Sequence, residues 1–368
     1  MATSTVSLAR DAAQVAALLD SPEVVSLIAE LEATRWTGRP GYPIRSMVGL
    51  ALVKSLYAIP TWTRAVALVK DHAGLRDALG AVPSTDAAYR FSIKLRVHGG
   101  MLSACITRVL ARLHAAHPEM GNAVAIDGSD LPAYANGQRY VKRGGELRKR
   151  FADPDATWGH RSSISTRSGG GYYGYKVHCA VDIATGLPVA WQVETAKDSE
   201  IPMVPVLLDA AQARGFTPGT AILDRGYDTQ ALYDLLESRD IRPVIPLRMT
   251  PAVKRGMASP PSCDHGTWTF AGSDTKRGAS KWRCPTGECQ PASVWVKASR
   301  LHPLIPRETE RYKSLYHQRG AVEREFGHLK HEWAMLPLRV RRIFQVRLHV
   351  DLTILAQLAS ALLATRTP

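Results

Sequence analysis

The chain is 368 residues long, with 45% hydrophobic and 22% charged residues, a composition typical of a globular protein and not of a disordered or fibrous one. Its 47 Lys and Arg residues outnumber 33 Asp and Glu residues, for a formal net charge of +14, and such a surplus favours polyanionic partners. The most apolar stretch, residues 352–364, contains polar residues and is too short for a bilayer span. An odd number of cysteines, five, and no apolar signal segment argue for a reducing compartment.

Residues 1–118 have the pattern of a helical region, in which apolar residues recur at helical spacing and prolines separate the segments. The predicted helices are Ala12–Leu19, Glu23–Ala33, Ile44–Tyr57, Thr63–Val69, Ser84–Leu95 and Met101–Ala115. Ser84 is the expected N-cap of its helix, and Arg90, Lys94 and Arg96 follow on it. This region is therefore either a helix-turn-helix-like DNA reader or a helical packing or dimerisation module.

The pattern changes after Gly121, and residues 119–248 alternate between short apolar runs and amphipathic segments. The predicted order is strand Ala123–Ile126, hairpin Tyr172–Asp182 with Leu187–Glu194, helix Ile201–Arg214, strand Thr220–Leu223, helix Thr229–Ser238 and strand Pro243–Pro246. This order predicts a mixed α/β sheet with helices packed on it.

Residues 249–307 interrupt this order with Gly, Pro, Ser and basic residues, and they predict an insertion of short strands and loops. The insertion contains four residues that could be tetrahedral zinc ligands, namely Cys263, His265, Cys284 and Cys289. The spacing lacks two Cys-x2-Cys knuckles, so an insertion without a metal remains the alternative. Residues 308–368 return to a helical pattern that closes the chain.

Two clusters of basic residues stand out along the chain. One extends from Arg139 to Arg167, and the other has four arginines between Arg339 and Arg347. Such clusters can follow a phosphate backbone or can be solvated surfaces.

Two aspartates share the same local setting. Asp127 follows the apolar run Ala-Val-Ala-Ile, and Asp224 follows Thr-Ala-Ile-Leu. Ligands gather beyond the carboxyl ends of strands in α/β sheets, so both carboxylates are expected to face one crevice. The alternative is that each aspartate starts a turn or caps a helix.

A third acid, Glu323, lies in a segment with the pattern Tyr-x2-Arg-x3-Glu-x6-Lys, formed by Tyr316, Arg319, Glu323 and Lys330. On a helix, Arg319, Glu323 and Lys330 share one face, which offers one carboxylate between two cations. Glu325 points about 200° away from Glu323 at 100° per residue, which makes Glu323 the candidate.

With these motifs the chain resembles the DDE transposases of bacterial insertion sequences, in the group related to the IS4 and IS5 elements. The matching motifs are Ala-Ile-Asp127-Gly-Ser, Ile-Leu-Asp224-Arg-Gly-Tyr-Asp and the Tyr-Arg-Glu-Lys pattern, over residues 121–350. Residues 38–95 resemble, more weakly, the helical domain that precedes the catalytic domain in such enzymes. The resemblance implies an RNase-H-like mixed sheet with an N-terminal helical region and a small β/loop insertion.

The resemblance also implies a mechanism. Asp127, Asp224 and Glu323 would be the catalytic residues and would bind two Mg²⁺ or Mn²⁺ ions, which suits hard carboxylate oxygens. Arg319 and Lys330 would hold phosphates near the scissile bond, and Tyr316 would contact the DNA end. The enzyme would cut DNA at the ends of its element and then join the freed 3′-hydroxyl to target DNA.

The expected partners are the terminal inverted repeats and target DNA, bound by a dimer or higher oligomer, with no membrane. The expected location is the bacterial cytoplasm, at the nucleoid. Two alternatives remain open at this point: a DNA-binding protein derived from a transposase that no longer cuts, and an RNase-H-like nuclease without strand transfer.

Overall fold

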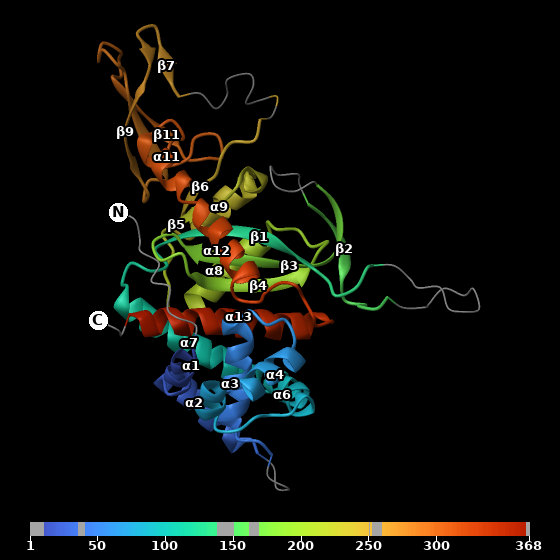
Figure 1. The fold of residues 1–368 in the computed structure, drawn as a ribbon. Helices are drawn as coiled ribbons and strands as arrows, with labels where there is room; N and C mark the ends of the chain where they lie inside the picture. The colour runs from blue at the N-terminus through green and yellow to red at the C-terminus, as the bar shows by residue number, and fades with distance from the viewer. Residues whose placement is uncertain are drawn as a thin grey trace, which may run out of the picture.

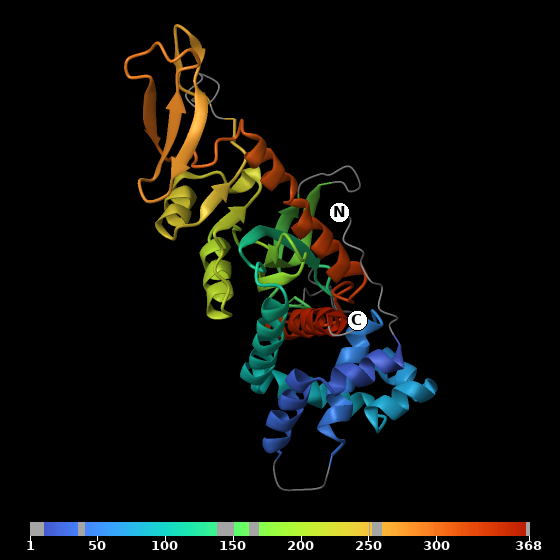
Figure 2. The ribbon, with the colours of Figure 1, turned by 90° about the vertical axis from the view of Figure 1, so that its left-hand side faces the viewer.

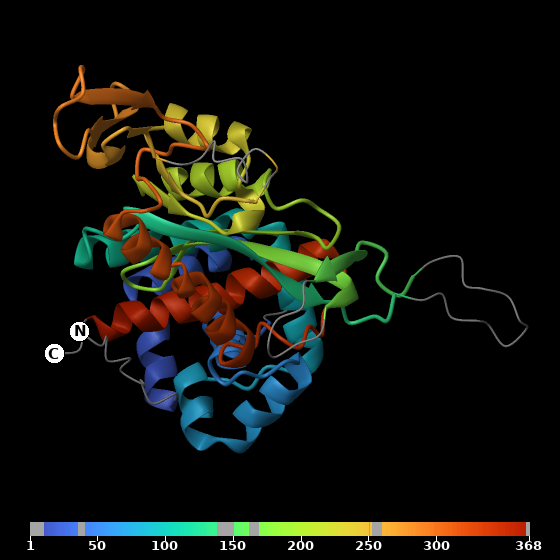
Figure 3. The same ribbon diagram turned by 90° about the horizontal axis from the view of Figure 1, so that it is seen from above.

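The computed structural model describes residues 11–35, 41–137, 151–161, 169–249, 251 and 260–365. Three regions follow one another in space: N-terminal helices, a central mixed sheet with its covering helices, and the insertion (Figure 1). The insertion lies beside the helix α9 (Gln230–Ser238) and away from the N-terminal helices (Figure 3).

The N-terminal region is helical, as the sequence predicts. Its helices are α1 (Ala12–Leu19), α2 (Pro22–Ala33), α3 (Ile44–Leu56), α4 (Trp62–Asp71), α5 (Ala73–Leu79), α6 (Thr85–Val97) and α7 (Gly99–Ala116). The Ser84 side chain caps α6 by accepting from the amide of Ala87 at 3.2 Å, which confirms the predicted N-cap. The short helix α5 was not predicted; the His72 ring caps it through the amide of Leu75 at 3.2 Å.

The long helix α13 (Ile343–Ala364) joins the N-terminal helices to the sheet. It packs against α1, α3, α6 and α7, and also against the strand β4 (Pro188–Thr195) (Figure 1). The expectation that this apolar stretch is too short for a bilayer was wrong, because the helix begins at Ile343. By length and composition α13 could cross a membrane, but 78% of its apolar window is buried inside the protein. Its apolar side chains therefore pack in the core of the protein.

The central sheet is mixed, and its strand order fixes the fold. Its strands are β1 (Ala123–Pro132), β2 (Thr157–Arg161), β3 (Gly170–Asp182), β4, β5 (Thr220–Ile222) and β6 (Arg242–Val244). β3 pairs antiparallel with β1 on one edge and with β2 and β4 on the other. β5 runs parallel to both β1 and β6. The order β4-β3-β1-β5-β6, antiparallel and then parallel, is the RNase-H-like arrangement that the sequence predicts.

Helices cover both sides of this sheet. Figure 2 shows α11 (Glu310–His317) and α12 (Gly320–His331) on one side and α8 (Met203–Ala213) and α9 on the other. The packing follows the sequence pattern, since Val322, Phe326 and Leu329 of α12 are buried. One continuous apolar cluster extends from Val15 through the sheet to Leu362, so the N-terminal helices and the sheet form one body.

The insertion is separate in its packing. It contains β7 (Ser262–Cys263), β8 (Gly266–Thr267), β9 (Thr269–Asp274), β10 (Ala279–Arg283) and β11 (Ser293–Lys297), with β9, β10 and β11 in one antiparallel sheet. Its own buried cluster consists of Trp268, Trp282 and Cys284. The short strands that the sequence predicts here are therefore present.

Candidate active site

Asp127 and Asp224 are brought together by the register of two parallel strands. The β1–β5 ladder pairs Ala125 with Ile222, and Asp127 and Asp224 each follow two residues later in the chain. Contrary to the sequence expectation, β1 does not end at Asp127; it continues to Pro132 as an antiparallel partner of β3. The crevice therefore opens because β5 ends, at Ile222, while β1 continues.

The structure confirms the capping alternative for Asp224, and its role as a ligand stays a prediction. The residue is the N-cap of a short 3-10 helix, η1 (Arg225–Tyr227), and its Oδ1 accepts from the amide of Gly226 at 2.6 Å. This hydrogen bond fixes the carboxylate at the edge of the crevice. Capping and ligand binding are compatible because a carboxylate has two oxygens with several acceptor sites.

Arg319 connects the first and third acids. Its Nη2 lies 3.1 Å from Asp127 Oδ2, and its Nη1 lies 2.5 Å from Glu323 Oε1. Glu323 is 60% exposed on the side chain, whereas Glu325 is buried and accepts from Gln357 Nε2 at 3.0 Å. The helical-face argument that prefers Glu323 to Glu325 thus agrees with the structure.

Tyr316 lies on a different helix from the one that carries Glu323. α11 ends at His317, and Arg319 is the N-cap of α12, so the predicted single helix is broken between the tyrosine and the glutamate. Burial raises the pKa of Tyr316, and the carboxylates of Asp224 and Glu323 act in the same direction against Arg319. The phenol therefore lies beside the acids in spite of the break.

Lys330 is directed at β1. Its Nζ lies 2.7 Å from Ser129 Oγ and 3.5 Å from Asp130 Oδ1, and its side chain is 12% exposed. These contacts attach the C-terminal end of α12 to the strand of Asp127. In this structure Lys330 positions the two elements that carry acids.

Asp127 has an unusual environment for a carboxylate. Burial raises its pKa to about 7, against the lowering effects of Arg319 and the Gly128 amide, and Asp224 and Glu200 raise it further. Asp127 is thus a desolvated carboxylate with other acids near it, and a cation would relieve the repulsion. The carboxylates offer the hard oxygen ligands that Mg²⁺ and Mn²⁺ prefer. Arg319 supplies positive charge to Asp127 and Glu323. Among the described residues, the ligand atoms of Asp127, Asp224 and Glu323 do not all lie within 4.8 Å of one another, so their fit to a divalent metal rests on the chemistry of their oxygens.

Sequence reasoning missed several residues that border the acids. Glu200 forms an ion pair with Lys176 at 3.0 Å, and Tyr227 is buried beside Asp127. His178, which is opposite Gly128 in the β1–β3 ladder, is 1% exposed, and neither ring nitrogen has a hydrogen-bond partner among the described residues. Tyr227 belongs to the Asp224 motif, whereas no local motif marks Glu200 or His178. The pairing of β3 with β1 places His178 opposite Gly128.

The pairing of β1 with β3 also favours a glycine at position 128. A Cβ there would lie 2.9 Å from His178 Nδ1 and 3.4 Å from Glu200 Cγ. Any larger residue would therefore push the histidine or the glutamate away from the acids.

A cavity of about 630 Å³ is lined in part by Gly226 and Tyr227, which follow Asp224 in the chain, while Asp127, Asp224 and Glu323 are not part of its lining. Its lining includes Glu200 and Tyr227, the cations Lys176 and Lys197, and the ring of Trp158, which is 54% exposed. Basic and aromatic side chains around an open cavity suit a polyanion that carries flat bases.

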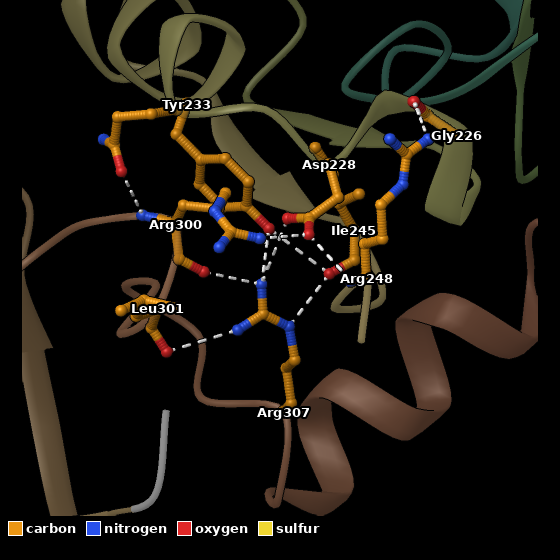
Figure 4. Close-up of polar contacts among 9 residues, drawn as sticks. Gly226, Asp228, Tyr233, Ile245, Arg248, Arg300, Leu301 and Arg307 are labelled. Carbon is orange, nitrogen blue, oxygen red and sulfur yellow. Dashed lines mark hydrogen bonds and ion pairs between the residues drawn. The ribbon is translucent and has the colours of Figure 1, made fainter. Parts of the chain in front are cut away.

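A buried ion-pair network supports the loop of Asp224 (Figure 4). Asp228 Oδ2 accepts from Arg300 Nη1 at 2.6 Å and from the amide of Arg248 at 2.7 Å. Arg307 donates to Tyr233 Oη at 2.6 Å and to the carbonyl of Ile245 at 3.0 Å. Asp228 is the last residue of the Asp224 motif, so this network ties the catalytic loop to the segment by which the chain leaves the insertion.

The structure gathers three of the four predicted zinc ligands. The sulfurs of Cys263, Cys284 and Cys289 lie within 4.8 Å of one another. The fourth residue, His265, is outside this group, and its Nδ1 lies 3.3 Å from Glu288 Oε2.

The structure describes little of the first basic cluster and all of the second. Most of Arg139–Arg167 falls outside the described residues. In the second cluster Arg347 forms an ion pair with Glu194 at 2.9 Å, while Arg339 and Arg341 each lie 5.0 Å from the centre of the Tyr134 ring.

Comparisons with known proteins identify the family of the chain. A family model described as "Transposase DDE domain" matches residues 119–358, and the chain belongs to this family. It therefore contains a DDE transposase domain. DDE enzymes use divalent metals.

Among solved structures, the cryo-EM structure of a piggyBac transposase synaptic complex with hairpin DNA is similar to this chain. The TM-score is 0.45 at 14% identity, and the match covers 97% of this chain and 75% of that one. No curated protein sequence matches the chain significantly.

Proposed function

We propose that the protein is the transposase of a bacterial insertion sequence, related to the IS4 and IS5 elements, which cleaves DNA at the element's ends and joins them to target DNA. Asp127, Asp224 and Glu323 hold two Mg²⁺ or Mn²⁺ ions in this proposal. When bound, such ions activate the attacking oxygen and stabilise the leaving oxygen of a phosphodiester.

The observation that carries the proposal is the convergence of three acids from three elements. Asp127 and Asp224 are adjacent through the β1–β5 register, and Arg319 bridges Asp127 to Glu323. Burial raises the pKa of Asp127 to about 7, and the nearby Asp224 and Glu200 raise it further. A metal ion bound beside Asp127 would stabilise its charged form, which supports the proposal.

The remaining residues of the site have roles that follow from their contacts. Arg319, already held between two carboxylates, is placed to contact a phosphate near the acids. Tyr316, half-buried beside them, is placed to contact the terminal nucleotide. Lys330 holds α12 on β1, and its contribution to DNA binding is therefore indirect.

The partners follow from the reaction. An element has two ends, so two subunits must meet on DNA, and we expect a dimer or larger assembly at the active stage. The net charge of +14 favours binding to DNA throughout the nucleoid of the bacterial cytoplasm.

The test is cleavage of a labelled duplex that carries the native element end, in Mg²⁺, in Mn²⁺ and in EDTA. We expect metal-dependent nicking at the end, reduced about a thousand-fold or more by Glu323→Gln, because several kcal/mol of charge stabilisation would be lost. The matched control is Glu310→Gln, an exposed glutamate of α11 that pairs with Lys313; it should cut like the wild type.

The outcomes separate the alternatives. Specific end binding with no cutting in either metal would identify a non-catalytic DNA-binding protein. Cutting without joining to a target duplex would identify a nuclease without strand transfer.

A further inference from the structure

The first inference concerns the insertion, whose three clustered cysteines are unrelated to the acids. Cys263 ends β7, Cys284 follows β10, and Cys289 lies in the turn between β10 and β11. All three are free thiols. Two separate turns thus converge on one point.

The spacing of the sulfurs fits a tetrahedral metal. Cys263 Sγ and Cys284 Sγ lie 3.8 Å apart, and two sulfurs on a tetrahedral zinc with bonds of about 2.3 Å are separated by about 3.8 Å. A disulfide would require about 2.05 Å.

His265 is outside the group of sulfurs but follows Cys263 by two residues in the chain. Its Nδ1 lies 3.3 Å from Glu288 Oε2, and Glu288 is adjacent to Cys289 in the chain. A zinc-bound histidine commonly donates its second ring N–H to a carboxylate. The contact with Glu288 thus leaves Nε2 as the ring nitrogen available to a metal.

The small core of the insertion is a reason to expect a structural metal. The insertion has a small buried cluster of its own, Trp268, Trp282 and Cys284, and units with so small a core commonly need disulfides, a metal or oligomerisation to fold. We propose that Cys263, Cys284, Cys289 and His265 bind one structural zinc ion that holds the insertion together. This proposal does not depend on transposase activity.

The test measures metal in the purified full-length chain under reducing conditions. We expect one zinc per chain, lost in Cys284→Ser and bound about ten-fold or more weakly in His265→Ala. Cys105→Ala, which alters a buried cysteine of α7, is the matched control and should keep its zinc. Cobalt in place of zinc should give the absorption of a tetrahedral thiolate site.

A second readout covers variants that fold poorly. Chelation should make the insertion sensitive to protease while the sheet and the N-terminal helices stay intact. Absence of zinc after reconstitution, unchanged zinc in Cys284→Ser, or a Cys263–Cys284 disulfide in the native protein would each overturn the proposal.

The second inference rests on a different observation, a cavity of about 260 Å³ between the N-terminal helices and the core. Lys54 of α3, Trp62 of α4 and Tyr89 of α6 line it from one side, and Tyr134, Arg339 and Arg341 line it from the other. No acidic residue is part of the lining.

Lys54 is a buried amine with no carboxylate partner among the described residues. Its Nζ lies 3.2 Å from His349 Nδ1 and 5.7 Å from the Trp62 ring centre, and it is 4% exposed. His349 Nε2 lies 3.2 Å from the carbonyl of Met335, which can only accept, so Nδ1 accepts from Lys54. Burial lowers the pKa of Lys54 to about 8. An anion in the cavity would stabilise the ammonium.

The cavity is connected to the catalytic elements on both sides. Tyr134 follows β1, which carries Asp127, and Arg339 follows α12, which carries Glu323. Arg341 Nε also donates to the carbonyl of Tyr134 at 3.0 Å. A DNA strand that leaves the acids along β1 would therefore pass the mouth of the cavity.

We infer that this cavity binds a backbone phosphate of the DNA, between Lys54 and the two arginines, with the aromatic rings against its sugar and base. The inference rests on the proposed function, because it names a contact of the same DNA substrate. Phosphate contacts of this kind position DNA without reading its sequence.

The test combines DNA affinity with stability for Lys54→Met in the full chain. We expect affinity for the element end to fall about ten-fold and the slope of log affinity against log salt to decrease by about one, while the melting temperature rises because a buried charge is removed. A structural lysine would give the reverse: a lower melting temperature with unchanged DNA affinity. Lys70→Met, an exposed lysine of α4, is the matched control.

The outcomes distinguish the two proposals. If the wild type binds no DNA, the proposed function fails. If the wild type binds and cuts DNA but Lys54→Met binds equally well, the cavity inference alone fails. If inorganic phosphate raises the melting temperature of the wild type but not of Lys54→Met, and DNA affinity is unchanged, the cavity takes a free anion and not DNA.

Discussion

The body of the protein and its insertion are stabilised in different ways. In the body, α13 packs against the N-terminal helices and the sheet together, and one apolar cluster extends through both. In the insertion, the buried cluster is Trp268, Trp282 and Cys284. Hydrophobic burial dominates in the first region, whereas in the second the proposed zinc ion would add a cross-link to a small core.

The two regions meet where function requires rigidity. Asp228, four residues after Asp224, is 0% exposed on its side chain and pairs with Arg300 at 2.6 Å, in the segment that leads back from the insertion. The position of the insertion is thereby coupled to the loop that carries an acid of the site. The comparison teaches that an insertion with a weak core can still influence the catalytic loop through one buried ion pair.

The largest expected effect is a loss of cleavage activity that leaves the insertion unaffected. Asp224→Asn should reduce end cleavage by about a thousand-fold or more, since a charged metal ligand becomes neutral, and should leave DNA binding and the zinc content unchanged. Strand cleavage, filter binding and metal analysis of the same preparation measure this. Loss of DNA binding together with cleavage would show that Asp224 supports the fold of the binding surface.

The next largest effect is expected at Asp228, where the body of the protein contacts the segment that leads back from the insertion. Asp228→Asn leaves Arg300 and Arg307 buried without a negative partner, and removing one member of a buried pair costs about 3–5 kcal/mol. We expect a lower melting temperature and reduced cleavage with the zinc still bound. Glu310→Gln breaks an exposed pair with Lys313, which is worth about 1 kcal/mol or less; a similar loss in both variants would contradict the special role of Asp228.

A third pair of variants tests whether the two cores are independent. Leu355→Ala in α13 should lower the free energy of unfolding of the body by about 2–5 kcal/mol. Trp282→Ala, which removes the edge contact with Phe270 at 5.7 Å, should open the insertion to protease and leave the main calorimetric transition in place. A single transition that shifts equally in both variants would mean that the regions unfold together.

The smallest effect is a pH dependence that belongs to the body. The pKa of Lys54 is about 8 in the folded protein against the usual 10.5, so the unfolded chain binds more protons between these values. Stability of the wild type relative to Lys54→Met should therefore rise with pH from about 8 to 10.5, by at most about 1.4 kcal/mol per pH unit. Denaturant unfolding at several pH values measures this, and a flat difference would mean that Lys54 keeps its ordinary pKa.

Local patterns in the sequence were sufficient for most elements. The helices of the N-terminal region follow from apolar periodicity, and α1 begins and ends where that pattern does. The hairpin of β3 and β4 follows from two β-rich runs with a turn at Ile183–Gly186 between them. β2 was not predicted, because Thr157–Arg161 has no buried apolar side.

The candidate site was predictable only in part. The structure brings Asp127, Asp224, Glu323, Arg319 and Tyr316 together, and their catalytic roles stay a prediction. The break between α11 and α12 could not be found from periodicity, since Arg319 and Glu323 still interact across the start of α12. Glu200 was missed, and the surroundings of His178 and Asp228 were not predicted, because they depend on residues far away in the chain.

The sequence by itself determined the order of the elements, the acids that follow apolar runs, and the mixed α/β class, because these depend on neighbours within a turn of helix or a few strand residues. Only the tertiary structure decided that Asp127 lies inside a strand, that Lys330 contacts Ser129, and that three cysteines meet while His265 faces Glu288. Strand register and helix packing join residues that are distant in sequence, and no local pattern specifies those distances.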